Sequence, residues 1–268
     1  MIEPVAEGGK EKAAEVHIWF TQLDQVNPAS MERYKTWFTS AEQSQFLNFR
    51  SERRCREFIV GRGLARWALA HEFGVSPESF EFATGPQGKL SIDRPEFARD
   101  VHFNISHTAD RVVCGTCRGF GIGLDVELIA TRVDPLLIAK RFFSESESNA
   151  LLALSDFERL AQFFSLWTLK EAFAKAHGIG LLAPIDTCRF DMAGDGSFQV
   201  TSTDASLAQG AWLASAALSP KHRLSVCVLC DDTTKVHIVV HPGPSEPVDT
   251  VGNLRWTEGR LQKPGIET

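Results

Sequence analysis

The stretch Gly121-Ile122-Gly123-Leu124-Asp125-Val126-Glu127-Leu128 determines how the rest of the chain is interpreted. Its residues alternate between apolar and small or acidic types, which predicts a strand whose larger apolar side chains share one buried face. The opposite face then carries Asp125 and Glu127 side by side, next to glycines that leave room for a ligand. Two like charges this close disfavour each other's ionised form, so the pair favours a bound cation, and carboxylate oxygen is the ligand that magnesium prefers. A solvated strand edge is the alternative that this stretch alone leaves open.

A third acidic residue lies on the helix that is predicted over about residues 157–177. Thr168, Glu171 and Lys175 share one narrow stripe of this helix at helical spacing. Because the helix is apolar nearly all round, it should be buried, and Glu171 should be partly desolvated and need a cation. That cation is either a metal ion or Lys175, one turn further along.

Three other segments present groups that suit a phosphorylated ligand. The strand predicted at residues 101–105 ends in a Ser-His step. No acidic partner for a serine-hydrolase triad lies nearby in the sequence, so His107 is interpreted as a phosphate or ribose ligand, with a core or turn histidine as the alternative. The glycine-rich turn at residues 85–89 presents Lys89 without the P-loop spacing. Arginines crowd the helical region at residues 41–73, either as a solvated face or as ligands for phosphate: Arg53, Arg54, Arg56, Arg62 and Arg66.

A similar order of elements occurs twice between two expected tails, residues 1–15 and 242–268, the latter with too few apolar residues to pack well. Residues 16–120 should form a first half, with strands at 16–20, 101–105 and 111–117 and helices within 41–73. Residues 121–241 should form a second half, with the acidic strand, helices at 135–154 and 157–177, and strands at 188–191, 198–201, 211–218, 224–229 and 236–240. Capping-box spacing at Thr39 and Ser144, and glycines at 74 and 178, are typical of helix starts and ends. This order predicts an α+β fold with an internal duplication.

Composition excludes several classes of function. The 268-residue chain has a formal net charge of −6, so it lacks the overall positive charge that drives nucleic-acid binding. No apolar stretch approaches the roughly 20 residues of a membrane span, and the leader has no signal-peptide core, so we expect a cytoplasmic protein with no membrane partner.

Two C-x-x-C pairs, Cys114/Cys117 and Cys227/Cys230, suggest zinc. Residues three apart on a strand face opposite sides, however, which favours reduced cysteines that pack as small hydrophobes.

Five motifs carry a family resemblance: G-x-x-G-K-L at residues 85–90, F-N-I-S-H-T at 103–108, G-I-G-L-D-V-E at 121–127, R-F-F-S-E-S-E at 141–147 and W-T-L-K-E-A-F-A-K at 167–175. In this order and spacing they resemble the 4'-phosphopantetheinyl transferases of the long, surfactin-synthetase-activating type, over about residues 51–182. The resemblance implies a monomer built as a pseudo-dimer of two similar two-layer α/β halves. It also implies that coenzyme A and Mg²⁺ bind in the cleft between the halves.

The same resemblance implies a role for each matching residue. The metal ligands would be Asp125, Glu127 and Glu171. The cofactor-binding residues would be Arg66, Lys89 and His107 near the adenosine phosphates, Lys170 and Lys175 near the pyrophosphate, and also Ser106.

The expected reaction transfers the 4'-phosphopantetheine arm of coenzyme A to a serine of an apo acyl or peptidyl carrier protein and releases 3',5'-ADP. Glu147 or Glu171, directly or through a water, would take the serine proton, and Lys175 would stabilise or protonate the departing ADP. Glu147 also completes the capping box of Ser144, which is its structural alternative. Two other classes remain: a catalytically silent binding module, whose mark would be a broken metal-ligand set, and a metal-dependent phosphoesterase.

Overall fold

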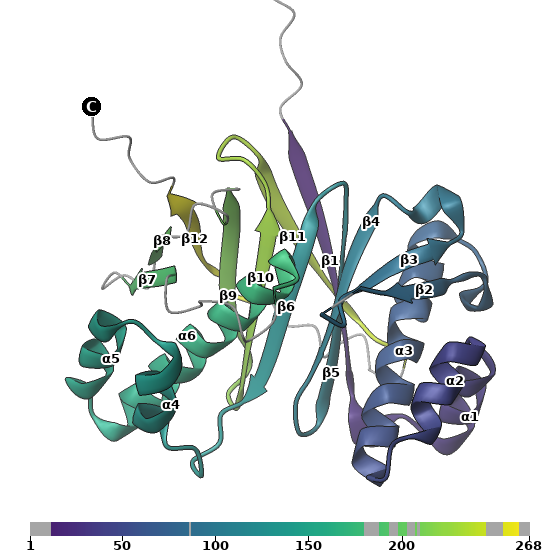
Figure 1. The fold of residues 1–268 in the computed structure, drawn as a ribbon, viewed down its shortest axis with the longest axis horizontal. Helices are drawn as coiled ribbons and strands as arrows, with labels where there is room; N and C mark the ends of the chain where they lie inside the picture. Colours follow the sequence, from purple (N-terminus) through teal and green to yellow (C-terminus); the bar gives the residue numbers. More distant parts are fainter. Residues whose placement is uncertain are drawn as a thin grey trace, which may run out of the picture.

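The computed structural model describes residues 12–85, 87–179, 188–192, 198–202, 207, 210–244 and 254–262. Two β-sheets pack face to face, and each has helices on its outer face, so the layers run helix, sheet, sheet, helix (Figure 1). The predicted α+β class is confirmed, and the two expected two-layer units meet through their sheets. None of the described helices is long and apolar enough to span a membrane.

The first sheet has the strand order β11-β1-β5-β4. Its members are β1 (Ala13–Gln22), β4 (Val101–His107), β5 (Arg111–Arg118) and β11 (Lys235–Pro242). β1 pairs antiparallel with β5 and parallel with β11. The outer face is covered by α3 (Glu52–Phe73), beside α1 (Pro28–Thr36), α2 (Ser40–Leu47) and the hairpin of β2 (Glu81–Thr84) and β3 (Leu90–Arg94). Short 3-10 helices among the described residues include η1 (Leu23–Gln25), η2 (Pro77–Ser79) and η3 (Glu96–Ala98).

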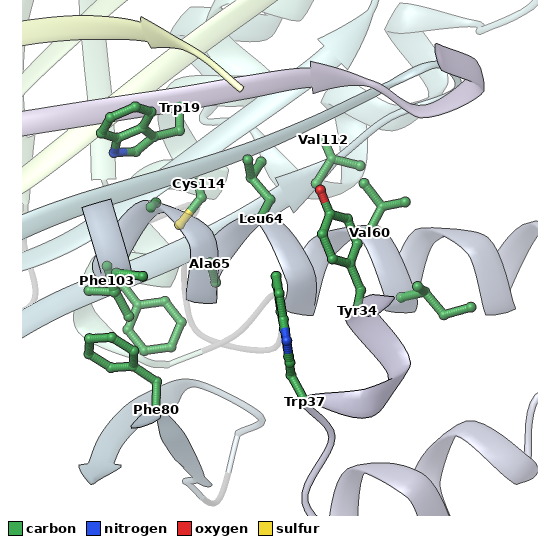
Figure 2. Close-up of a cluster of buried hydrophobic side chains, with 14 of the residues drawn as sticks. Trp19, Tyr34, Trp37, Val60, Leu64, Ala65, Phe80, Phe103, Val112 and Cys114 are labelled. Carbon is green, nitrogen blue, oxygen red and sulfur yellow. The ribbon is translucent and has the colours of Figure 1, made fainter. Parts of the chain in front are cut away.

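Aromatic and aliphatic side chains fill the space between the first sheet and its helices. Figure 2 shows Trp19 of β1 and Val112 of β5 on the sheet side, with Leu64 of α3 and Tyr34 of α1 reaching toward the sheet. Tyr34 lies against Gly63, where an added Cβ would approach the tyrosine ring to 2.3 Å. A glycine here therefore lets α1 pack closely on α3.

The second sheet has the strand order β6-β10-β9-β12-β8-β7. Its strands are β6 (Gly121–Leu128), β7 (Cys188–Met192), β8 (Phe198–Ser202), β9 (Ala211–Ser219), β10 (His222–Leu229) and β12 (Thr257–Gln262). The long helix α6 (Asp156–His177) packs on β6 and β10, and α4 (Pro135–Phe142) and α5 (Glu145–Leu152) pack against α6. The predicted capping boxes at Thr39 and Ser144 are both present, and α3 and α6 end at left-handed Gly74 and Gly178.

Alternation along the strands builds the core between the sheets, as predicted for β6. Ile122, Leu124 and Val126 pack there against apolar residues of β1, β5, β9 and β10. Cys114 and Cys117 lie in different cores on opposite faces of β5, which confirms the interpretation of that C-x-x-C pair. Burial raises the pKa of the Cys117 thiol to about 12.

Two expectations about the ends of the second half are corrected. Residues 257–262, assigned to a tail, form β12 between β9 and β8, and Leu261 is buried there. The predicted strand at residues 236–240 exists as β11, but it pairs with β1 in the first sheet. β12 buries Leu261 from a segment whose composition alone is too polar to indicate packing.

Candidate active site between the two sheets

Two sheet edges, β4 and β6, meet through side chains. Each strand ends its own sheet, so the backbone N–H groups on its outer side have no strand to pair with. Asn104 Oδ1 accepts from the N–H of Leu124 (3.0 Å), Ser106 Oγ from Val126 (3.3 Å) and Thr108 Oγ1 from Leu128 (3.0 Å). These three residues, spaced two apart along β4 and the residue that directly follows it, form what we call the side-chain ladder.

The ladder also contacts the acidic face of β6. Ser106 Oγ donates to Asp125 Oδ1 at 2.9 Å, and Thr108 Oγ1 donates to Glu127 Oε2 at 3.2 Å. Asp125 is only 4% exposed. The solvated-edge alternative for this strand is therefore wrong, because α6 covers the face that carries both carboxylates.

Glu171 reaches the same place from α6. The helix approaches β6 so closely that a Cβ on Gly123 would lie 2.1 Å from the carbonyl oxygen of Ala172. Burial, and then the neighbouring carboxylates Asp125 and Glu127, raise the pKa of Glu171 to about 7, although Lys175 acts in the opposite direction. The pKa of Glu127 is raised by burial and by Asp125. The fold therefore brings together all three residues that were expected to bind metal.

Lys175 provides a cation for this acidic cluster. Its Nζ lies 2.5 Å from Asp125 Oδ1 and donates to Ser106 Oγ at 3.1 Å. The sequence suggested Glu171 as the partner of Lys175, whereas the ion pair is made with Asp125 on the facing strand. Glu171 thus keeps a buried carboxylate next to a cation that is already engaged.

A hard divalent cation suits the donor set of this cluster. Asp125 Oδ2 and Glu171 Oε1 are buried and have no hydrogen-bond partner among the described residues. Buried, unpartnered carboxylate oxygens are costly unless a cation meets them. Within the described part of the chain no three His, Cys, Asp or Glu side chains stand close enough to share an ion. The unpartnered oxygens of Asp125 and Glu171 are therefore of the chemical type that magnesium prefers.

Basic side chains line two adjoining pockets of about 210 Å³ each beside the cluster. Both pockets are lined by Lys89 and Asn104; one extends to Arg54, Arg62 and His107, and the other to Lys175. The pKa of His107 is lowered by burial and by the nearby cations, although Glu57 opposes this. Burial also lowers the pKa of Lys89, whose Nζ donates to the carbonyl oxygen of Ala176. The expected cofactor residues Lys89 and His107 thus share one basic cavity.

Arg66 is not in this cavity, which corrects its expected role. Its side chain is fully buried, with Nη1 and Nη2 bonded to Glu42 and Nε bonded to the carbonyl oxygen of Phe80. All of these bonds tie α3 to α2 and to the segment before β2. Arg62, one turn earlier on α3, lines the pocket in its place.

Lys170 and Glu147 are also displaced from their expected roles. Lys170 is 2% exposed; its Nζ lies 3.0 Å from Glu147 Oε2 and donates to the carbonyl oxygen of Cys188 at 2.6 Å. Glu147 accepts from the backbone N–H groups of Ser144 and Phe190. This buried pair holds α5, α6 and β7 together, so Glu147 is the structural residue that its capping box indicated, and neither residue faces the cluster.

Sequence reasoning missed the ladder. Ser106 was expected to bind the cofactor, but its hydroxyl is occupied by Asp125, Lys175 and the backbone of β6. Thr108 and Asn104 were assigned no role. The signal was present in the alternation N-x-S-x-T of residues 104–108, three short polar side chains on one face of a strand at the end of a sheet.

Comparison with known proteins places this site in a family. A family model described as the 4'-phosphopantetheinyl transferase superfamily matches residues 121–227, which include β6 and α6. The 4'-phosphopantetheinyl transferase HetI of Nostoc is 32% identical, covering 62% of this chain and 70% of that protein. The transferase psf-1 of Bacillus pumilus is 30% identical (76% and 85%), and Sfp of Bacillus subtilis 29% identical (75% and 86%). The chain therefore belongs to the 4'-phosphopantetheinyl transferase superfamily.

Proposed function

We propose that this protein transfers the 4'-phosphopantetheine group of coenzyme A to a serine hydroxyl of apo acyl or peptidyl carrier proteins, with Mg²⁺, releasing 3',5'-ADP. The observation that carries the proposal is the set of buried, unpartnered carboxylate oxygens of Asp125 and Glu171 beside a cavity lined by Arg54, Lys89 and His107. The carboxylate oxygens suit a cation, and the basic side chains of the cavity suit phosphate groups. A coenzyme whose pyrophosphate and 3'-phosphate bind across this boundary would meet both.

The basic cavity is the proposed binding place of the ADP part of coenzyme A. Arg54 and Arg62 offer guanidinium groups from α3, and Lys89 offers an ammonium from the turn before β3. His107, 42% exposed in its side chain, can donate to a phosphate oxygen from the end of β4. Because Lys89 lines both pockets, it lies between the α3 arginines and Lys175.

Asp125, Glu127 and Glu171 are the proposed magnesium ligands. When bound there, Mg²⁺ supplies charge neutralisation to the pyrophosphate and lowers the cost of the charge that develops on the leaving group. The protein residues supply the orientation. Asp125 and Glu127 accept hydrogen bonds from the hydroxyls of Ser106 in β4 and of Thr108 directly after it, and Glu171 is fixed on a buried helix.

Glu171 and Lys175 are the proposed catalytic residues. The pKa of Glu171 is about 7 in the metal-free protein, and a bound cation would lower it and keep the group ionised. The carboxylate could then accept the proton of a serine hydroxyl, directly or through a water. Lys175 lines the second pocket and can donate to the departing phosphate oxygen of 3',5'-ADP. For this it must leave Asp125 Oδ1, which the arrival of a cation at Asp125 would favour.

The test incubates the protein with coenzyme A, Mg²⁺ and an apo carrier protein, and weighs the carrier by mass spectrometry. Transfer adds one phosphopantetheinyl group to the carrier and releases one 3',5'-ADP. Binding of coenzyme A without a mass change would indicate a silent binding module, and breakdown of coenzyme A without carrier modification would indicate a phosphoesterase. Either result would contradict the proposal.

We further propose that the protein acts as a monomer in the cytoplasm. The residues of the proposed site all come from one chain, and the six cysteines are free thiols, as is usual in a reducing compartment.

A further inference from the structure

Two of the three ladder residues, Ser106 and Thr108, each make two kinds of hydrogen bond. A hydroxyl has one hydrogen to donate and two lone pairs that accept. Thr108 Oγ1 accepts from the N–H of Leu128 and donates to Glu127 Oε2. Ser106 Oγ accepts from the N–H of Val126 and from Lys175 Nζ, and donates to Asp125 Oδ1. Each hydroxyl thus binds the backbone of β6 and one adjacent carboxylate at the same time.

This double contact fixes the direction of each carboxylate. A donor on one oxygen restricts rotation of the carboxyl group and leaves the second oxygen for another partner. In Asp125 the oxygen that remains, Oδ2, is the buried and unpartnered one. Both hydroxyls belong to the first half of the chain, whereas the carboxylates belong to the second.

We propose that Ser106 and Thr108 are positioning residues for the cation site, so that the first half of the chain completes a site whose ligands all lie in the second half. The inference rests on the proposed magnesium-dependent function and assigns these two residues no contact with substrate. Side chains that orient metal ligands affect metal affinity strongly, typically 10- to 100-fold on mutation.

Asn104 provides a matched control within the same ladder. It accepts from the N–H of Leu124 in the same way as the two hydroxyls accept from Val126 and Leu128. The neighbouring residue on the acidic face of β6 is Gly123, which has no side chain to orient. Breaking this contact therefore weakens the joint between the strands without releasing a carboxylate.

The experiment compares Thr108→Val, Thr108→Ser, Ser106→Ala and Asn104→Ala with wild type. Binding of Mn²⁺ in the presence of saturating coenzyme A is followed by electron paramagnetic resonance, and melting temperature is measured on the same samples. We expect Thr108→Val and Ser106→Ala to weaken Mn²⁺ binding about 10- to 100-fold. Thr108→Ser, which keeps the hydroxyl, should bind Mn²⁺ nearly as wild type does. Asn104 also lines the two pockets, so its variant needs its own saturating concentration of coenzyme A; at that concentration Asn104→Ala should lower the melting temperature and leave Mn²⁺ affinity unchanged.

The kinetic counterpart is a rise in the Mg²⁺ concentration needed for half-maximal rate in Thr108→Val, with kcat largely recovered at saturating Mg²⁺. If Thr108→Val lowers the melting temperature like Asn104→Ala but binds Mn²⁺ like wild type, the ladder is only a structural joint and the inference is overturned. If Ser106→Ala does not fold, the comparison of Thr108→Val with Thr108→Ser is sufficient to test the inference. A wild-type protein that neither binds Mn²⁺ nor modifies a carrier would overturn the proposed function and this inference with it.

Discussion

Glu171 shows how one residue acquires a chemical property from its surroundings. On α6 it is packed among apolar side chains and near two other carboxylates, and its pKa rises to about 7 from an ordinary 4.5. The apolar helix predicted that Glu171 would be desolvated, and the two acidic residues of β6 predicted a bound cation. The sequence did not predict that Lys175 would pair with Asp125, because that contact depends on how α6 crosses β6.

The raised pKa of Glu171 predicts how stability depends on pH in the metal-free protein. The folded state holds the Glu171 proton up to about pH 7, whereas the unfolded chain releases it near pH 4.5. Stability should therefore fall by about 2 to 3 kcal/mol as pH rises between these values. Urea unfolding in EDTA should show this slope in wild type and a much flatter one in Glu171→Gln. Glu145→Gln, which removes an exposed carboxylate of α5, should keep the slope; a Glu171→Gln protein with the wild-type slope would contradict the assignment.

Substitutions of Lys175 and of Lys89 should affect different kinetic constants. Lys175→Ala should lower kcat far more than it raises the KM for coenzyme A, because its proposed contact forms mainly as the ADP oxygen departs. Lys89→Ala should chiefly raise the KM for coenzyme A. Both variants are assayed at saturating Mg²⁺, since loss of the Lys175 cation also changes the charge around Asp125. An unchanged kcat in Lys175→Ala would make this lysine a ground-state phosphate ligand.

At the scale of elements, most helices and strands could be predicted because their signals are local. Alternation identified β6, and capping spacing located α2 and α5. The helix α1 was missed, since its nine residues are mostly polar and only Tyr34 is buried. Arg66, Lys170 and Glu147 were misassigned for a related reason. The identity of a charged residue in a motif does not tell whether its side chain faces a ligand or a buried partner in the protein. The partners here, Glu42 and Cys188, also lie far away in sequence.

Gly123 determines how closely α6 approaches β6. A Cβ at this position would lie 2.1 Å from Ala172 O and 2.3 Å from Ala176 N, both backbone atoms that cannot rotate away. Gly123→Ala should therefore destabilise the protein by about 3 kcal/mol or more and separate Glu171 from β6. The control is Gly61→Ala in α3, where the added methyl would meet only the end of the Ile105 side chain at 3.3 Å. That variant should stay within about 1 kcal/mol of wild type. Equal urea midpoints for the two variants would show that the helix can move aside.

At the scale of the whole molecule, the chain crosses between its two sheets near the C-terminus. After β10 in the second sheet, the chain forms β11 beside β1 in the first sheet and then returns as β12 in the second (Figure 1). A division at residue 120 therefore does not separate the sheets. The two sheets are joined by the ladder between β4 and β6, and elsewhere by the apolar core that they share.

The position of β12 makes the C-terminal segment a structural part of the second sheet. β12 pairs with β9 on one side and β8 on the other, so among the described strands it is the one that connects β8 and β7 to the rest of the sheet. β7 in turn supplies the Cys188 carbonyl and the Phe190 N–H that bind the buried Lys170–Glu147 pair. Removing residues 256–268 should thus expose apolar surface and leave that pair without partners.

We expect this truncation to cost about 4 kcal/mol or more, measured by urea unfolding, with loss of amide protection in β7 and β8. Removing only residues 263–268 leaves β12 whole and should preserve the urea midpoint. If the longer truncation does not fold, Leu261→Ala tests the same claim, because this buried leucine should cost about 3 kcal/mol when its side chain is removed. A wild-type urea midpoint in the truncated protein and in Leu261→Ala would mean that β12 does not contribute to the stability of the sheet. In that case the buried Lys170–Glu147 pair must be held by α5 and α6 alone.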